Sequence, residues 1–192
     1  MKRIAVASFI VLSLIGAPLA FAQSTVEEQQ KQFQKMLDQV TWKNLAIDFY
    51  DVKDKAADGY KSMTVKSADE KNGQTFYVSK KSILSLKNTE NIDLSYQPGD
   101  GDNVRLMIKF NPEGKKTLAE YTTANINQLM GVVVDGKLRL VATLRQPLNN
   151  GRVQVYGFSA NEAVGILERY YQPKLDVAKK FSQQIAMKAV PK

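Results

Sequence analysis

The stretch from Gly131 to Lys137 has the glycine and lysine spacing of a phosphate-binding loop, with Gly136 directly before the lysine. A true P-loop places a serine or threonine after the lysine to bind magnesium, but Leu138 stands there. The variable positions 132–134 are three β-branched valines, which favour a strand over a loop that holds an anion. We therefore expect a strand and a turn here, and no nucleotide or other cofactor.

Two acidic features could also carry chemistry. Asp100 and Asp102, in the run PGDGDN at 98–103, suggest calcium, but a calcium loop needs more oxygen ligands, including a distant bidentate glutamate. Glu162 could serve as a catalytic carboxylate, yet it is also the third residue of a capping box opened by Ser159. We expect a polar loop and a helix cap, and therefore no metal site and no catalytic residue.

The composition removes most other catalytic arrangements. The 192 residues include no cysteine and no histidine, which excludes disulfides, thiolate nucleophiles, Ser-His-Asp triads and the usual zinc sites. An enzyme built on carboxylates alone stays possible. The formal net charge of +8 comes from scattered lysines rather than one long basic run, so we expect no nucleic-acid partner.

The first 22 residues are typical of a secretory signal peptide. Lys2 and Arg3 precede an apolar run over 4–15, and Ala20-Phe21-Ala22 supplies an A-x-A cleavage pattern. Cleavage is expected between Ala22 and Gln23, with Ala20 and Ala22 as the recognised small residues. Since no later stretch is long and apolar enough to cross a membrane, we expect a water-soluble protein in the periplasm.

The remaining chain predicts one α+β domain with a mostly antiparallel sheet, helices packed on one face, and helices at both ends. The expected division is an N-terminal helix at 23–44, the domain at 45–172 and a C-terminal helix at 173–192. Strands are expected at 45–52, 75–78, 104–110, 132–134, 138–142 and 152–156. The stretch 53–74 is polar and carries Gly59 and the turn signal Asn72-Gly73.

Caps and turns set the expected boundaries. Asn111-Pro112 begins a helix that keeps its period to Leu129 and ends at Gly131. Asp135-Gly136 predicts a two-residue hairpin turn, because this pair tolerates positive φ. The helix that starts at the Ser159 capping box is expected to end at Pro173, where the last helix begins.

The ordered motifs resemble the head part of the first periplasmic domain of SecD, a subunit of the SecDF protein-export factor. The resemblance covers roughly residues 45–170. The residues that carry it are Phe110, Gly114, Thr122, Asn125, Gly131, Asp135, Gly136, Asn150, Gly151, Gly157, Phe158, Ser159, Glu162 and Ala163. We interpret them as structural positions. The sequence departs from the family pattern at Asn127-Gln128, at 141–143 and at 168–173.

The resemblance implies a domain that contacts exported polypeptides. Together with the lack of catalytic groups, it favours a non-enzymatic periplasmic protein- or peptide-binding module, chaperone-like or related to export. A sheet edge and the abundant tyrosines would bind an extended strand. Two alternatives stay open: a structural subunit of an envelope assembly, and a carboxylate-based envelope enzyme. The partner is expected to be a polypeptide or an envelope protein, and the oligomeric state stays open.

Overall fold

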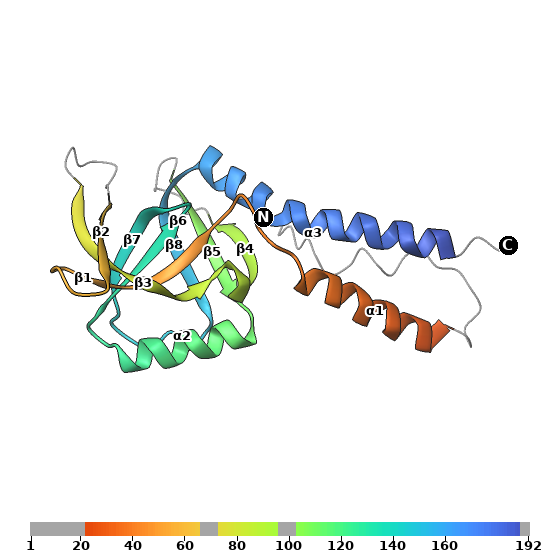
Figure 1. The fold of residues 1–192 in the computed structure, drawn as a ribbon, viewed down its shortest axis with the longest axis horizontal. Helices are drawn as coiled ribbons and strands as arrows, with labels where there is room; N and C mark the ends of the chain where they lie inside the picture. Colours follow the sequence, from red (N-terminus) through yellow and green to blue (C-terminus); the bar gives the residue numbers. More distant parts are fainter. Residues whose placement is uncertain (1–21, 66–72, 96–102, 189–192) are drawn as a thin grey trace. The chain divides into compact units, whose positions relative to one another are not determined.

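The computed structural model describes residues 22–65, 73–95 and 103–188 as an α+β fold with two antiparallel sheets. This confirms the expected fold class. The contacts divide the chain into two compact units (Figure 1). Thr41–Asp176 forms one unit, which we call the head unit, and Met1–Val40 with Val177–Lys192 forms the other. The predicted division at 22/23, 44/45 and 172/173 stays a prediction.

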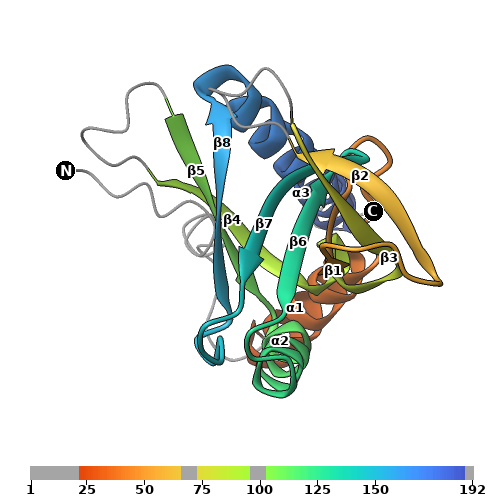
Figure 2. The same cartoon turned by 90° about the vertical axis from the view of Figure 1, so that its left-hand side faces the viewer.

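The five-stranded sheet has the order β2-β3-β1-β6-β7. Its strands are β1 (Ile47–Lys53), β2 (Tyr60–Val65), β3 (Gln74–Ser85), β6 (Leu129–Val134) and β7 (Lys137–Thr143). The sheet curls into a half-barrel, so that the edge strands β2 and β7 approach each other without pairing (Figure 2).

The three-stranded sheet has the order β4-β5-β8. Its strands are β4 (Thr89–Ser95), β5 (Asn103–Phe110) and β8 (Arg152–Ser159). The short 3₁₀ helix η1 (Leu86–Asn88) leads from β3 into β4. In β5, Leu106, Ile108 and Phe110 are buried and alternate with half-buried Arg105, Met107 and Lys109, as the period of the sequence predicts.

Helices α2 and α3 complete the main core. Helix α2 (Pro112–Ala124) lies across one end of the strands (Figure 1), and it buries Leu118. The first part of α3 (Ala160–Lys188) buries Ala163, Ile166 and Tyr170 in the cluster that the two sheets share. The ring centroids of Phe49 in β1 and Phe110 in β5 lie 5.1 Å apart, in an edge-to-face pair across this core.

The predicted cap and hairpin are confirmed. The Asn111 side chain accepts a 2.8 Å hydrogen bond from the Gly114 amide, and Pro112 is the first residue of α2. Asp135 and Gly136 have φ values of 48° and 77°, which a type I′ turn requires, and they join β6 to β7. The polar stretch 53–74, where the sequence indicates only turns, contains the strand β2.

The predicted helix end at Gly131 is wrong. Helix α2 ends at Ala124, its C-cap is Asn125, and Gly131 lies inside β6. A Cβ atom on Gly131 would lie 2.6 Å from Val52 Cγ2 and 3.1 Å from Leu138 Cδ1. The glycine is therefore explained by close packing within the sheet rather than by the end of a helix.

The predicted helix end at Pro173 is also wrong, since α3 continues through it. Pro173 cannot donate to the Arg169 carbonyl, and its ring crowds the preceding turn. The Trp42 indole Nε1 donates a 2.8 Å hydrogen bond to the neighbouring Tyr170 carbonyl, and its ring stacks on Tyr170 at 5.6 Å. Tertiary contacts thus support the helix where its own hydrogen bonding is weakened.

The second unit contains α1 (Ala22–Asp38) and the last part of α3, residues 177–188. Phe33 of α1 packs on the buried Phe181 of α3 with ring centroids 5.0 Å apart. Ala22 and Gln23 are the first residues of α1, and Ala20 lies outside the described residues. No helix in the described ranges is long and apolar enough to cross a membrane.

Candidate functional site

The concave face of the half-barrel carries a second apolar cluster, separate from the main core. Its floor is buried and consists of Val52, Phe76, Val78, Val133 and Leu138. Around it lie partly buried side chains, which we call the rim: Tyr50, Met63, Val65, Leu129 and Val141. The half-barrel sheet thus buries apolar residues on both faces and leaves the rim residues partly accessible on one of them.

The register of β1 on β6 shows which residues share this face. Asp48 pairs with Val133, Tyr50 with Gly131, and Val52 with Leu129. The intervening residues Ile47 and Phe49 point to the main core, where both are fully buried. Asp48, Tyr50 and Val52 therefore lie in line along the concave face.

Strand β2 contributes the opposite side of this face. Lys61 pairs with Val78 and Met63 pairs with Phe76, so Lys61 and Met63 share the face of these two floor residues. Ser62 and Thr64 alternate with them and are exposed on the other face. β2 and β7 are the outer strands of the sheet, and among the residues that the structure describes neither has a second strand partner.

Asp48 is an acidic residue on the concave face. Its side chain is half-buried, and burial raises its pKa, with the Lys61 charge acting in the opposite direction. Tyr50, two residues along, also has a raised pKa, first because of burial and then because of the Asp48 charge. No hydrogen bond or ion pair reaches the Asp48 carboxylate from the residues that the structure describes.

A cavity of about 430 Å³ opens where β1 and β6 meet the half-barrel's end. It includes the cluster residues Val52 and Leu129, the β1–β2 loop at 53–57, and Asn127-Gln128. Its size is that of a small-ligand pocket, but its lining is mainly exposed polar side chains. We therefore regard it as an extension of the concave face rather than as a separate site.

Tyrosines flank this end of the half-barrel. The Tyr60 hydroxyl donates to Asp51, and this hydrogen bond is the main cause that raises the pKa of Tyr60 to about 12. The Lys53 ammonium lies 4.7 Å from the centre of the Tyr60 ring. Burial is also the main cause of a raised pKa at Tyr121. These phenols stay protonated, so they supply hydrogen bonds and ring surfaces rather than a tyrosinate base.

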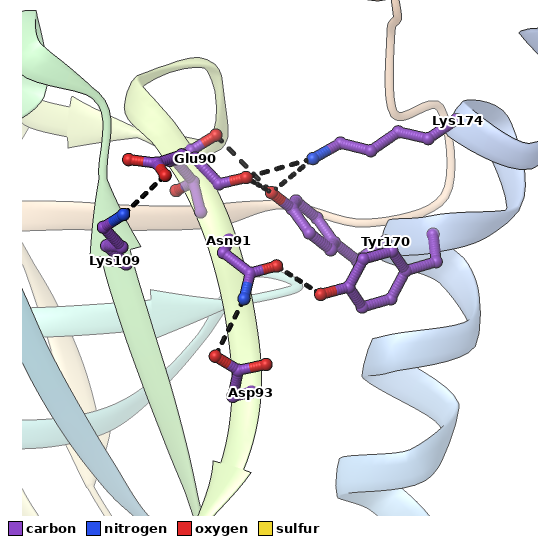
Figure 3. Close-up of polar contacts among 8 residues, drawn as sticks. Glu90, Asn91, Asp93, Lys109, Tyr170 and Lys174 are labelled. Carbon is purple, nitrogen blue, oxygen red and sulfur yellow. Dashed lines mark hydrogen bonds and ion pairs between the residues drawn. The ribbon is translucent and has the colours of Figure 1, made fainter. Parts of the chain in front are cut away.

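A second polar cluster joins α3 to the outer edge of β4 (Figure 3). The Tyr170 hydroxyl donates to the Glu90 carbonyl at 2.8 Å, and the Tyr171 hydroxyl donates to the Ile92 carbonyl at 3.0 Å and contacts the Asn91 side chain. Lys174 Nζ donates to the Glu90 carbonyl at 3.2 Å and to the Tyr170 hydroxyl at 2.7 Å. These side chains bond to carbonyls of β4, which is an edge strand of the three-stranded sheet with β5 as its neighbour.

The Tyr170–Lys174 pair does not have the electrostatics of a catalytic pair. Burial is the main cause that lowers the pKa of Lys174 to about 8, and burial also raises the pKa of Tyr170. A catalytic tyrosinate needs a lowered phenol pKa, which is the opposite shift. Tyr170 is fully buried, so the cluster is explained as a contact between helix and sheet.

The capping box at the start of α3 is confirmed. The Glu162 carboxylate accepts from the Ser159 amide at 3.1 Å, and the Ser159 hydroxyl accepts from the Glu162 amide at 3.3 Å. Arg139 of β7 adds bonds to Glu162 at 3.3 Å and to the Gly157 carbonyl at 2.8 Å. The Ser159 amide is the first cause of the lowered pKa of Glu162. The carboxylate is thus fully engaged in holding elements together.

The other motif residues lie in turns, contacts and the core. The Thr122 hydroxyl accepts from the Leu148 amide at 2.9 Å, and the Asp135 carboxylate holds the Ala46 amide at 3.0 Å and Arg169 at 2.7 Å. Phe110, Phe158 and Ala163 are buried in the main core. Gly114 and Gly151 lie in close contact with neighbouring residues, Gly114 with Asn88 and Phe110 and Gly151 with Lys115. The Asn125 side chain donates a 2.8 Å hydrogen bond to the Tyr121 carbonyl at the end of α2.

Of these motif residues, Gly131 belongs to the concave face, opposite Tyr50. The sequence interpretation missed Asp48, Tyr50, Lys61 and Met63 as site residues. An available signal was Asp48, one of two aspartates in the otherwise apolar and aromatic stretch 45–52. The calcium suggestion at Asp100 and Asp102 lies outside the described residues. Within the described ranges, no group of three or more acidic side chains is placed to hold a metal.

The family model for the SecDF P1 head subdomain matches residues 61–167, which is more than half of the sequence. The chain belongs to the SecDF P1 head subdomain family. The match includes β2, β3, β6 and β7 of the half-barrel and ends within α3. The resemblance inferred from the ordered motifs is confirmed.

Individual relatives are more distant. The protein translocase subunit SecD of Treponema pallidum (strain Nichols) is 28% identical over 92 residues, which are 48% of this chain and 16% of that protein. The SecD subunit of Thermobaculum terrenum is 26% identical over 81 residues, 42% of this chain and again 16% of the relative. The matches thus span less than a fifth of each SecD protein.

Solved structures support the fold. A SecDF structure, described as a membrane component that enhances protein export, matches with a TM-score of 0.50 and 16% identity, covering 81% of this chain and 70% of that chain. SecDF in a super-membrane-facing form matches with a TM-score of 0.50 and 18% identity, covering 73% and 20% of the two chains.

Proposed function

We propose that this chain is a non-enzymatic periplasmic module that binds extended polypeptide segments, in a role related to protein export. Membership of the SecDF P1 head family supports the export context. The observation that carries the binding role is the concave face, where partly buried apolar rim residues lie on and beside the two outer strands, which have no second strand partner among the described residues.

This surface matches the chemistry of an unfolded chain. An extended segment exposes backbone amides and carbonyls along its length, and a free edge of β2 or β7 supplies the complementary row. Because side chains of a strand alternate, every second residue of the segment would contact the rim at Met63, Val65 or Val141. Such binding depends on apolar character and extension, so it accepts many sequences.

Binding rather than catalysis is supported by the carboxylates. A general acid–base pair needs two titratable groups at one site with pKa values pushed apart. Asp48 has a raised pKa and lies on the concave face. Glu162 has a lowered pKa, but its carboxylate is bound by its capping box and Arg139 and so is engaged in structure rather than poised for proton transfer.

Site-specific photo-crosslinking in cells tests the proposal. A photoreactive phenylalanine at Met63 faces the concave surface, and the same residue at Thr64 faces away on the same strand. Capture of many unrelated exported chains at Met63 and few at Thr64 is the expected result, read by mass spectrometry. Equal capture at both positions, or none at Met63, would refute the binding site.

The same experiment separates the role of an assembly subunit. One recurrent envelope protein captured at Met63, in place of many different chains, would favour a fixed structural partner over a chaperone-like function.

A further inference from the structure

Asp48 occupies an unusual position for a carboxylate. It lies on β1 between the fully buried Ile47 and Phe49, in a pair with the buried floor residue Val133. Its own side chain is half-buried, and within the described residues nothing donates a hydrogen bond to it. A partly desolvated carboxylate without donors is costly unless a partner arrives, so such groups call for an explanation.

The neighbouring positive charge compensates Asp48 only in part. Lys61 acts on the carboxylate through its charge, but the two groups form no ion pair within 4.0 Å. Lys61 is exposed on the edge strand β2 and stays largely solvated. Its attraction is therefore weaker than that of a cation in direct contact with the carboxylate.

A bound segment would change this balance. An apolar segment laid over the rim excludes water from Asp48, which increases the desolvation cost of the carboxylate. A lysine or arginine of the segment that reached Asp48 would replace the lost water with a charge-assisted hydrogen bond. A glutamate or aspartate at the same place would add repulsion to the desolvation cost.

We propose that Asp48 is a specificity-determining residue that selects extended segments carrying a lysine or arginine among apolar residues, and disfavours acidic ones. This inference rests on the proposed polypeptide binding at the concave face. It adds a charge preference that apolar rim residues and strand edges do not supply.

The test uses three synthetic peptides of alternating leucine and serine that differ at one central position, which is lysine, glutamine or glutamate. Each peptide carries a fluorophore, and fluorescence anisotropy measures its dissociation constant with the full-length mature protein. For the wild type we expect the order lysine, glutamine, glutamate, with the lysine peptide at least tenfold tighter than the glutamate peptide.

The decisive variant is Asp48→Asn, which keeps the size of the side chain and removes the charge. It should bring the lysine and glutamate peptides to within about twofold of each other, as expected when one charge partner is removed. The matched control Glu120→Gln removes an exposed carboxylate on α2 and should leave the wild-type preference unchanged. Lys61→Gln should increase the preference for the lysine peptide. A thermal melt verifies that each variant folds.

The outcomes separate the two proposals. Tight binding of all three peptides without a charge preference would overturn the role of Asp48 and leave polypeptide binding intact. A preference that persists in Asp48→Asn would assign the selection to another residue and also overturn the role of Asp48. Failure of every peptide to bind the wild type would overturn the proposed function, and this inference with it.

Discussion

At the residue scale, Gly131 determines how closely the strands of the half-barrel pack. A methyl group there would meet Val52 at 2.6 Å and Leu138 at 3.1 Å, both buried in the floor of the concave face. Gly131→Ala should therefore lower the free energy of unfolding by about 1–3 kcal/mol through overpacking. Chemical denaturation with urea measures the change.

Gly165 is the matched control for this prediction. It lies within α3, and a Cβ atom there would meet nothing within 4 Å. Gly165→Ala should raise the free energy of unfolding by about 0.5–1 kcal/mol, because alanine favours the helix. If both variants changed stability in the same direction, the close contact at Gly131 would not be the cause.

Lys174 gives a prediction for pH dependence. Its pKa falls from 10.5 to about 8 in the folded protein, with burial as the main cause and Glu90 opposing it. Between these two values the unfolded chain binds more protons, so the Lys174 contribution to stability increases with pH in this window.

The measurement compares the wild type with Lys174→Met. Chemical denaturation at about pH 7 and about pH 10 gives the free energy of unfolding of both proteins. The value for the wild type minus that for the variant should be larger at the higher pH. The raised pKa of Tyr170 makes stability decrease with pH, but only above the ordinary tyrosine pKa of 10. This opposing effect sets the upper limit of the pH window. The exposed Lys180→Met should show no such trend. A constant or decreasing difference for Lys174→Met would contradict the expected effect of burial.

At the element scale, Pro173 predicts a stabilising substitution. Proline removes a hydrogen bond from the interior of α3 and crowds the preceding turn, which costs about 3 kcal/mol in an ordinary helix. Pro173→Ala should therefore raise the melting temperature, while Trp42→Phe, which loses the hydrogen bond to the Tyr170 carbonyl, should lower it. A lower melting temperature for Pro173→Ala would mean that the proline geometry is needed for the stacking of Trp42 on Tyr170.

The elements that sequence reasoning predicted well are those with local signals. Asn111-Pro112 and Asp135-Gly136 define their structures through side chains and φ values within a few residues. Strand β2 was missed because its apolar residues, Met63 and Val65, are few and its remaining residues are polar or amphipathic. Local rules also misjudged Pro173 and Gly131, because packing by Trp42, Val52 and Leu138 decides their structure.

The candidate site depended on long-range pairing, which local patterns do not contain. The alternation at 45–52 predicts one buried face, but β1 is buried on both, since Val52 contributes to the second cluster. Asp48 and Lys61 come together only through the pairing of β1 with β3 and of β3 with β2. Nothing within the 45–52 segment indicates that a lysine of another strand lies near.

At the scale of the whole molecule, residues 41–176 form a compact unit with the main core and the concave face. The sequence adds a predicted signal peptide before it. In a cell that exports the protein, the mature chain should begin at Gln23 and appear in the fraction released by forming spheroplasts. Mass spectrometry of the N-terminal peptide checks the cleavage, and recovery in the membrane pellet would contradict the expected location.

The capped edge of β4 has a consequence for self-association. Tyr170, Tyr171 and Lys174 occupy carbonyls that would otherwise template a further strand. An open strand edge can pair with the edge of a second copy and so seed a fibril. With these carbonyls of β4 engaged, two molecules that meet at high concentration lose one route to a shared sheet.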